Sequence, residues 1–293
     1  MSSIGVLFAL LAGLTWGVQN IWVKMLAKCG LETFQIGFVK VFFAALGLVV
    51  VMLIRNPKSL KVDVKDFWVF LGTGVLATVC YNYFGFYTTV NGGMAISEVL
   101  TYTSPVFVML ISAVLFKEKI TARKVIALAL TIIGCVFFAG LIGSGYRYEA
   151  FVILTGTLAG FSWSLYTIFS RFAIKKYEPL TITTWTFIVA TVATAFVGNV
   201  PGIVRTTIAY PEVIGWGLCL GVLSAATPYT LYTLAVQRLD PSRASIISSF
   251  ELIVGAVAGM ILFDEPHEFM KILGMLIILA AIILLSLNEK KNE

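Results

Sequence analysis

Long apolar runs, separated by short stretches that are charged or rich in Gly and Pro, dominate the chain. A helix needs about 20 mostly apolar residues to cross the hydrocarbon core of a bilayer. Each run must be helical in lipid, because only a helix satisfies its backbone hydrogen bonds within its own segment. The pattern predicts an all-α integral membrane protein with ten transmembrane helices, at 4–26, 34–54, 66–88, 95–116, 123–142, 150–171, 181–200, 212–235, 243–263 and 269–287.

The composition of the 293-residue chain agrees with this pattern. Hydrophobic residues make up 59% of the chain and charged residues 12%, whereas soluble proteins carry about 25% charged residues. The net charge of +6 is expected of loops that face a negatively charged leaflet. The bilayer is therefore the expected partner, and nucleic acid is not.

Residues that build catalytic and metal sites are scarce. The four cysteines form no Cys-x-x-Cys pair, and His267 is the only histidine. The chain has no His-Glu-x-x-His, Gly-x-Ser-x-Gly or P-loop motif. We therefore predict no metal, no cofactor and no enzymatic activity.

Basic residues are distributed unevenly between alternate loops. If both termini are cytoplasmic, fifteen Lys and Arg residues fall on the cytoplasmic side and five on the outer side. The positive-inside rule then predicts a multi-pass protein of the cell membrane with both termini in the cytoplasm. The cytoplasmic set is Arg55, Lys58, Lys61, Lys65, Lys117, Lys119, Arg123, Lys124, Arg171, Lys175, Lys176, Arg238, Arg243, Lys290 and Lys291, and the outer set is Lys24, Lys28, Arg147, Arg205 and Lys271.

The chain matches itself without gaps at a shift of 147 residues. Residues 11–24 meet residues 158–171 with five identities, and the same shift places 115–118 on 262–265. We predict two five-helix domains, 1–146 and 147–293. Because five is an odd number of spans, the second domain would enter the membrane in the opposite sense, as in carriers that work by alternating access.

Short motifs in both halves resemble those of the EamA family of the drug/metabolite transporter superfamily. They are Thr15-Trp16-Gly17, Ser104-Pro105-Val106-Phe107, Leu115-Phe116-Lys117-Glu118-Lys119-Ile120-Thr121, Ser162-Trp163-Ser164, Phe250-Glu251-Leu252-Ile253 and Leu262-Phe263-Asp264-Glu265. Leu252 stands where many members have a proline that kinks the ninth helix. The resemblance implies a transporter of small metabolites, often amino acids, that usually exports them without ATP.

Charged side chains inside a span mark a substrate or ion pathway by default. Lys40 lies about 10 Å from the outer end of the second span, although a lysine can also extend its amine to the interface. Glu251 lies too deep in the ninth span for its short side chain to reach water, so it should bind a substrate amine, carry a proton or be packed among helices. Glu98 is a weaker candidate, because a carboxylate is favoured at the start of any helix.

Trp16 and Trp163 fall near the middle of their spans and are equivalent under the repeat. They could face each other and form the walls of a substrate cavity, or they could simply pack in the core. Several polar residues at depth could bind substrate or join helices by hydrogen bonds. These are Gln19, Asn20, Asn82, Tyr83, Tyr102, Tyr166 and Ser248.

Small residues spaced four apart allow helices to approach closely. Such pairs favour packing within the chain, and the alternative is a homodimer. Four Gly-x-x-x-Gly spacings lie within the predicted spans, at Gly13/Gly17, Gly156/Gly160, Gly217/Gly221 and Gly255/Gly259.

The sequence thus predicts a secondary transporter, an exporter of small metabolites such as amino acids, that works by alternating access. The expected ligand is a small-molecule substrate, and proton coupling through Glu251 is an open option. A lipid flippase and a passive channel remain alternatives, because both fit the hydropathy. A carrier would differ from a channel by saturation and counterflow.

Reporter fusions test the predicted topology. We expect fusions at Glu293 and Ser59 to report the cytoplasm and a fusion near Ser144 to report the outside, because this arrangement gives the cytoplasmic side most of the basic residues. An external C-terminus would contradict the ten-span prediction.

Overall fold

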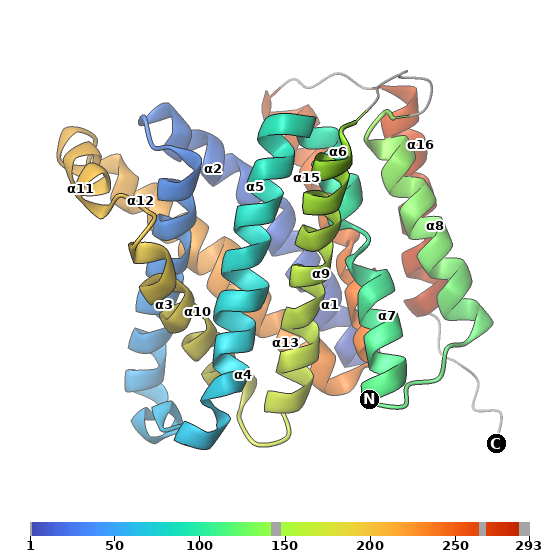
Figure 1. Ribbon diagram of the computed structural model, residues 1–293, viewed down its shortest axis with the longest axis horizontal. Coiled ribbons are helices and arrows are strands. Elements are labelled where there is room, and N and C mark those ends of the chain that lie inside the picture. Colours follow the sequence, from blue (N-terminus) through green and yellow to red (C-terminus); the bar gives the residue numbers. More distant parts are fainter. Residues whose placement is uncertain (1, 142–147, 264–267, 287–293) are drawn as a thin grey trace.

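The computed structural model describes residues 2–141, 148–263 and 268–286, and every regular element within these ranges is a helix. The helices form one bundle (Figure 1), in which α8 (Ala122–Phe138) and α16 (Phe269–Ser286) pack side by side at one edge. The helices α11 (Val200–Ala209) and α12 (Glu212–Leu218) lie at the opposite edge. The predicted all-α fold is confirmed for these residues.

The first half of the chain follows the predicted runs closely. The third run is one rod made of α4, η3 and α5, whereas the fourth is interrupted between α6 and α7. The elements are α1 (Ser2–Gly17), α2 (Gln19–Lys28), α3 (Thr33–Arg55), the 3-10 turns η1 (Pro57–Leu60) and η2 (Val64–Asp66), α4 (Phe67–Leu71), η3 (Gly72–Val79), α5 (Cys80–Gly92), α6 (Met94–Thr101), α7 (Ser104–Leu115) and α8.

The second half repeats this order of elements. The eighth predicted run is a rod made of α12, η4 and α13, and the ninth is interrupted between α14 and α15. The remaining elements are α9 (Ala150–Ala173), α10 (Pro179–Ala195), η4 (Cys219–Ala226), α13 (Thr227–Arg238), α14 (Pro241–Ser248) and α15 (Phe250–Phe263).

Fewer spans are found than the ten predicted. Eight stretches of the described chain are long and apolar enough to cross a membrane, or nine if α10 and α11 are one bent span. These two helices meet at 97°, because Asn199 between them is left-handed, with a φ of 46°. The predicted run 123–142 is also shortened, since α8 has 17 residues and ends before Gly140, whose φ is 64°. Ten spans therefore remain a proposal.

Irregular elements recur in both halves at the predicted shift of 147 residues. The two π-helices, η3 and η4, begin and end at equivalent positions, and α6 and α14 end at equivalent positions too. Regular packing would not by itself create such coincidences. The division into domains 1–146 and 147–293, and the inversion of the second domain, stay predictions.

A threonine hydroxyl bonds five residues back along the chain in or beside each π-helix. Thr78 Oγ1 donates to the Thr73 carbonyl oxygen at 2.8 Å, and Thr227 Oγ1 donates to the Val222 carbonyl oxygen at 2.9 Å. A π-turn contains one residue more than an α-turn and often occurs at functional sites. Here the π-helices lead directly into α5, which carries the candidates Asn82 and Tyr83, and into its counterpart α13.

Glycines bring the first helix of each half against an interrupted helix of the other half. A Cβ atom at Gly13 of α1 would lie 2.9 Å from the Ser248 carbonyl oxygen at the end of α14. A Cβ atom at Gly160 of α9 would lie 2.7 Å from the Leu100 carbonyl oxygen in α6. These glycines therefore serve packing within the chain, and a homodimer stays a prediction.

The start of α1 and the end of α16 lie at the same end of the bundle. Gly5 packs against Leu239 in the link between α13 and α14, and the Arg243 guanidinium donates to the Ser286 carbonyl oxygen at 3.4 Å. We call this the basic end, because it carries most of the basic residues predicted to be cytoplasmic. Lys290, Lys291 and Arg147 of the predicted distribution lie outside the described residues.

An exposed polar contact joins the two halves at the basic end. Lys176, in the link between α9 and α10, forms ion pairs with Asp63 and Asp66, in the link between α3 and α4. These hydrogen bonds hold the pKa of Lys176 above its usual value. Tyr177 donates to Asp66 at 2.6 Å and accepts from the Asp63 backbone N–H at 3.0 Å.

The glycine contact gives a stability prediction. Gly160→Ala should lower the melting temperature in detergent, because its Cβ atom would overlap backbone of α6, and overpacking costs about 1–3 kcal/mol. Gly37→Ala is the matched control, since a Cβ atom there meets nothing within 4 Å and alanine is favoured over glycine in a helix by about 1 kcal/mol. Equal melting temperatures for the two variants would show that the close approach is not required.

Candidate functional site

Two interrupted helices, one from each half, come together in the middle of the bundle. The first interruption, at Tyr102 and Thr103, is explained by Pro105, which has no N–H to donate and is tolerated only in the first turn of α7. The second interruption, at Ser249, occurs without a proline, because Leu252 stands at the position equivalent to Pro105. The helix is therefore interrupted near this position despite the departure from the family pattern at Leu252.

Serine supplies the second interruption in place of proline. Ser248 Oγ donates to the Ser245 carbonyl oxygen at 2.9 Å, and the Ser249 N–H bonds only three residues back, to the Ile246 carbonyl oxygen at 3.2 Å. Side-chain bonds of this kind compete with the helical ladder and bend helices. The candidate Ser248 is buried and serves this role in the structure.

Glu251 and Tyr102 meet at the two interruptions. The Tyr102 hydroxyl donates to Glu251 Oε1 at 2.6 Å, a short bond of the kind formed with a charged acceptor. The charges of Lys40 and Glu98 also act on the Glu251 carboxyl group. Both members of the bond are half-buried rather than sealed in the core. A carboxylate held in this way could exchange its tyrosine partner for a substrate amine.

Lys40 is bound within the bundle. Its amine donates to Gln19 Oε1 at 3.0 Å, so two of the predicted site residues contact each other. Gln19 begins α2, and the break between α1 and α2 at Val18 turns its amide towards α3. The arrangement places one cation and one amide near the acidic pair Glu98 and Glu251.

The two tryptophans contact each other instead of facing across open space. Their ring centroids are 5.5 Å apart in an edge-to-face arrangement. Trp16 is 4% exposed, and its ring also contacts Tyr229 and Tyr232. Trp163 is half-buried and contacts Tyr81. Trp16 is thus a core residue in this conformation, and Trp163 keeps an accessible part.

Tyr166 belongs to the packed part of this aromatic cluster. It is fully buried, its hydroxyl pairs with Thr233 Oγ1 at 2.8 Å, and its ring contacts Tyr229 at 4.8 Å. The hydroxyl of Tyr232 pairs with Thr167 at 2.7 Å. Tyr166 and Tyr232, whose hydroxyls are both hydrogen-bonded, therefore fill the core beside the two tryptophans.

Three other predicted site residues, Asn20, Asn82 and Tyr83, differ in how exposed they are. Tyr83 is 59% exposed and follows the exposed Leu76 at a spacing of seven residues, with Val90 seven residues further on. Such a stripe is typical of the outer face of a helix, and a role of Tyr83 in substrate binding stays a prediction. Asn82, the next residue on α5, is half-buried, and Asn20 is exposed; their roles stay predictions.

Sequence reasoning missed Tyr81, Tyr229 and Tyr232. Tyr81 and Tyr229 border Trp163, with centroids at 5.5 and 5.4 Å. Tyr229 and Tyr232 are three residues apart and so share one helix face. Two phenols at this spacing inside an apolar run were a signal that could have identified them.

Metal ligands do not gather in the described part of the chain, where no group of three His, Cys, Asp or Glu side chains could hold an ion. His267, with Asp264 and Glu265 of the repeat motif, lies outside the described residues. The chemistry of the centre therefore rests on one carboxylate pair, one amine, amides and aromatic rings.

Comparison with a family model gives a match in each half of the chain. The model of the EamA-like transporter family matches residues 3–140 and again residues 150–287. The two matches are offset by the same 147 residues as the internal repeat. Together they cover nearly the whole chain.

Similar proteins are described as transporters. An uncharacterized transporter of Archaeoglobus fulgidus is 23% identical over 270 residues, which is 92% of each chain. The pseudopaline exporter CntI of Pseudomonas aeruginosa is 26% identical over 297 residues, covering 98% of this chain and 97% of its own. One solved crystal structure has a TM-score of 0.79 at 13% identity over 97% of this chain and 96% of that chain, which shows a shared fold.

The aromatic cluster yields a prediction that separates packing from binding. Trp16→Ala should lower the melting temperature strongly, because replacing a buried tryptophan by alanine costs about 3–5 kcal/mol. Trp163→Ala should instead weaken ligand affinity by about five- to 150-fold, the loss of one aromatic contact of about 1–3 kcal/mol. Both quantities are measured on the same preparations.

Trp68→Ala is the control for the first variant, since Trp68 is 50% exposed on the bundle surface. If Trp16→Ala melts like Trp68→Ala, Trp16 is not part of the core. If Trp163→Ala changes stability alone and leaves affinity intact, its ring does not contact substrate.

Proposed function

Since the chain belongs to the EamA-like transporter family, we propose that it is a secondary transporter that exports small amine-bearing metabolites, amino acids or related compounds, by alternating access. The observation that carries this proposal is the bond between Tyr102 and Glu251 at the meeting point of the two interrupted helices. Carriers of inverted-repeat type place their sites at such interruptions, between the halves.

The charges at the centre support an amine-bearing substrate. Among the described residues, the charges of Lys40 and Glu98 act on the Glu251 carboxyl group. An incoming ammonium group would balance this excess of negative charge. The Lys40 amine and the amide N–H groups of Gln19 would donate hydrogen bonds to the carboxylate of an amino acid. The accessible part of Trp163 would contact the apolar portion of the substrate or stack with its cation.

Export is favoured by resemblance at the level of whole chains. The relative from Pseudomonas aeruginosa is named as an exporter, and it aligns over 98% of this chain. The direction proposed here also fits a cell-membrane protein whose basic end, with both termini, faces the cytoplasm. Glu251 could carry a proton in exchange for substrate, which would couple export to the proton gradient.

Ten spans complete this proposal. Eight or nine stretches qualify by length, and α8, at 17 residues, is about 26 Å long, close to the roughly 30 Å thickness of the hydrocarbon core. With α8 and the bent pair α10 and α11 as spans, each half has five. Both chain ends then fall on one side, in agreement with the contacts of Gly5 and Ser286 at the basic end.

Two alternatives predict different behaviour. A passive channel needs a continuous pore, whereas Tyr166 and Tyr232 are fully buried and hydrogen-bonded beside the two tryptophans. A lipid flippase would bind long acyl chains, for which the charged centre offers no partner. Both alternatives are distinguished from a carrier by flux measurements.

Glu251→Gln tests the proposal most directly. A thermal-shift screen of the purified protein against amino acids, polyamines, nucleosides and organic acids first identifies a ligand for proteoliposome assays. Glu251→Gln should then weaken binding of an amine-bearing ligand by about 10- to 150-fold, because a hydrogen bond to a charged group contributes about 1.5–3 kcal/mol. Any pH dependence of transport that comes from Glu251 should disappear.

Glu178→Gln provides the control, since Glu178 precedes α10 in a link between helices. Wild-type protein should show saturation and counterflow, as carriers do. Unchanged transport by Glu251→Gln at every pH would contradict the role of Glu251, and transport without saturation or counterflow would favour a channel.

A further inference from the structure

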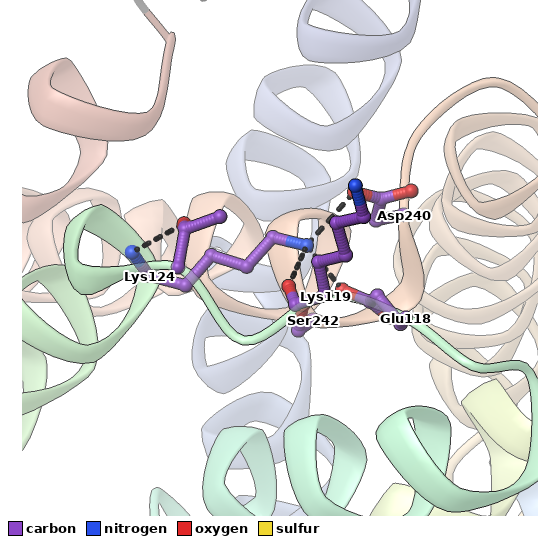
Figure 2. A network of polar contacts seen from close by, with 6 residues as sticks. Glu118, Lys119, Lys124, Asp240 and Ser242 are labelled. Carbon is purple, nitrogen blue, oxygen red and sulfur yellow. Dashed lines mark hydrogen bonds and ion pairs between the residues drawn. The ribbon is translucent and has the colours of Figure 1, made fainter.

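A cluster of polar side chains joins the start of α8 to the start of α14 at the basic end of the bundle (Figure 2). Lys124 is 5% exposed, and its amine contacts Glu118 Oε1 at 2.7 Å and Asp240 Oδ2 at 2.9 Å. Ser242 Oγ donates to the same Glu118 oxygen. We call Glu118, Lys124, Asp240 and Ser242 the basic-end cluster.

The basic-end cluster joins the two halves of the chain. Glu118 and Lys124 come from the link between α7 and α8 and from α8 itself, whereas Asp240 and Ser242 come from the link between α13 and α14 and from α14. Figure 2 shows the side chains from these two segments converging on the Lys124 amine. The contact therefore holds together two segments that belong to different repeats.

Local backbone structure positions the two acidic partners. Lys117 is left-handed, with a φ of 54°, and the N–H of Glu118 returns to the Ser112 carbonyl oxygen at 3.2 Å. This reversal ends α7 and points the chain back towards α14. Asp240 precedes Pro241, the first residue of α14, where proline fixes the start of the helix.

One face of α14 connects the basic-end cluster with the central site. Ser242, Ser245 and Ser248 are buried and follow one another at intervals of three residues, so they share a face. The helix is interrupted after Ser248, and Glu251 follows in the first turn of α15. The three serines therefore lie along α14 between the basic-end cluster and Glu251, the carboxylate proposed to bind substrate.

The cluster is incompletely satisfied. In the described part of the chain, Glu118 Oε2 is buried and has no hydrogen-bond partner. A purely structural ion pair in a membrane protein should bond both carboxylate oxygens, because each unsatisfied buried polar atom is costly. The contacts of Glu118 with Lys124 and Ser242 both use the oxygen Oε1.

The repeat does not preserve all four residues of the cluster. Under the shift of 147 residues, Lys124 corresponds to Lys271, but Asp240 and Ser242 correspond to Gly93 and Ala95. Glu265, the counterpart of Glu118, lies outside the described residues. The Asp240 carboxylate and the Ser242 hydroxyl therefore have no counterpart at the equivalent positions of the first half.

We propose that the basic-end cluster is the gate that closes the transport path at the basic end. The inference rests on the proposed transport function. The closed basic end is then the state that the empty carrier favours. Separation of α7 and α8 from the start of α14, with rupture of the Lys124 ion pairs, opens the path towards Glu251.

Distances between spin labels across the basic end test the gate without any substrate. Cysteines replace Ile120 and Gln237, which are exposed on either side of the cluster, in full-length protein whose four native cysteines are replaced by alanine. Pulsed electron paramagnetic resonance in nanodiscs should give one short distance for the otherwise unchanged protein. The variant Glu118→Gln/Lys124→Met/Asp240→Asn should add a population at longer distance.

The triple variant removes every charge of the cluster together, which avoids leaving one charge buried and unpaired. Lys117→Gln is the control, because it removes one positive charge from the same link outside the cluster, and it should keep the short distance. If the folded triple variant keeps the short distance, the cluster is only structural and the proposal is overturned.

If the triple variant does not fold, Asp240→Asn replaces it, since the Asp240 side chain is 55% exposed and its loss leaves the Glu118 pair intact. A smaller long-distance population is then expected, and an unchanged distance overturns the gate. The gate and the proposed function are tested by different measurements. Absence of counterflow contradicts the proposal that the protein is a carrier, whereas the distances between spin labels test the gate alone.

Discussion

Lipid offers no hydrogen-bond partner to the backbone of an interrupted helix, and this constraint organises the centre of the bundle. The breaks after α6 and α14 must be covered by other helices. Gly13 and Gly160 provide that cover, because only a glycine lets α1 and α9 lie directly against the exposed carbonyl groups. The same packing brings Tyr102 and Glu251 together, so the demand for backbone shielding also creates the polar centre.

Polar groups follow one another inside the bundle from the basic end to the middle. The ion pairs of Lys124 lie at the basic end, hydroxyls of α14 follow, and Glu251 lies at the centre. Around them the packing is aromatic and dense, with Tyr166 and Tyr232 fully buried. In a carrier this series would provide successive partners for a charged substrate, and the dense packing would prevent a leak of ions when no substrate is bound.

Hydropathy and self-comparison predicted the helices, the repeat and the central position of Glu251, because lipid imposes length and depth on a sequence directly. The sequence could not predict the bend at Asn199 or the early end of α8, since both depend on single backbone conformations. It also did not reveal that Tyr83 is exposed, because α5 mixes polar and apolar residues along its length. Contacts between halves, such as Lys124 with Asp240, depend on tertiary packing that one sequence does not reveal.

The π-helices η3 and η4 determine which way the following helices face. Each π-turn holds one residue more than an α-turn, so every later residue is rotated by about 100° relative to an uninterrupted α-helix. Tyr81 follows η3 closely, and Tyr229 follows η4. Loss of one residue from Gly72–Val79 would restore an α-helix and turn Tyr81 away from Trp163, while the hydropathy of the span would hardly change. The rings that border the central site therefore depend on chain length within two short segments as much as on residue identity.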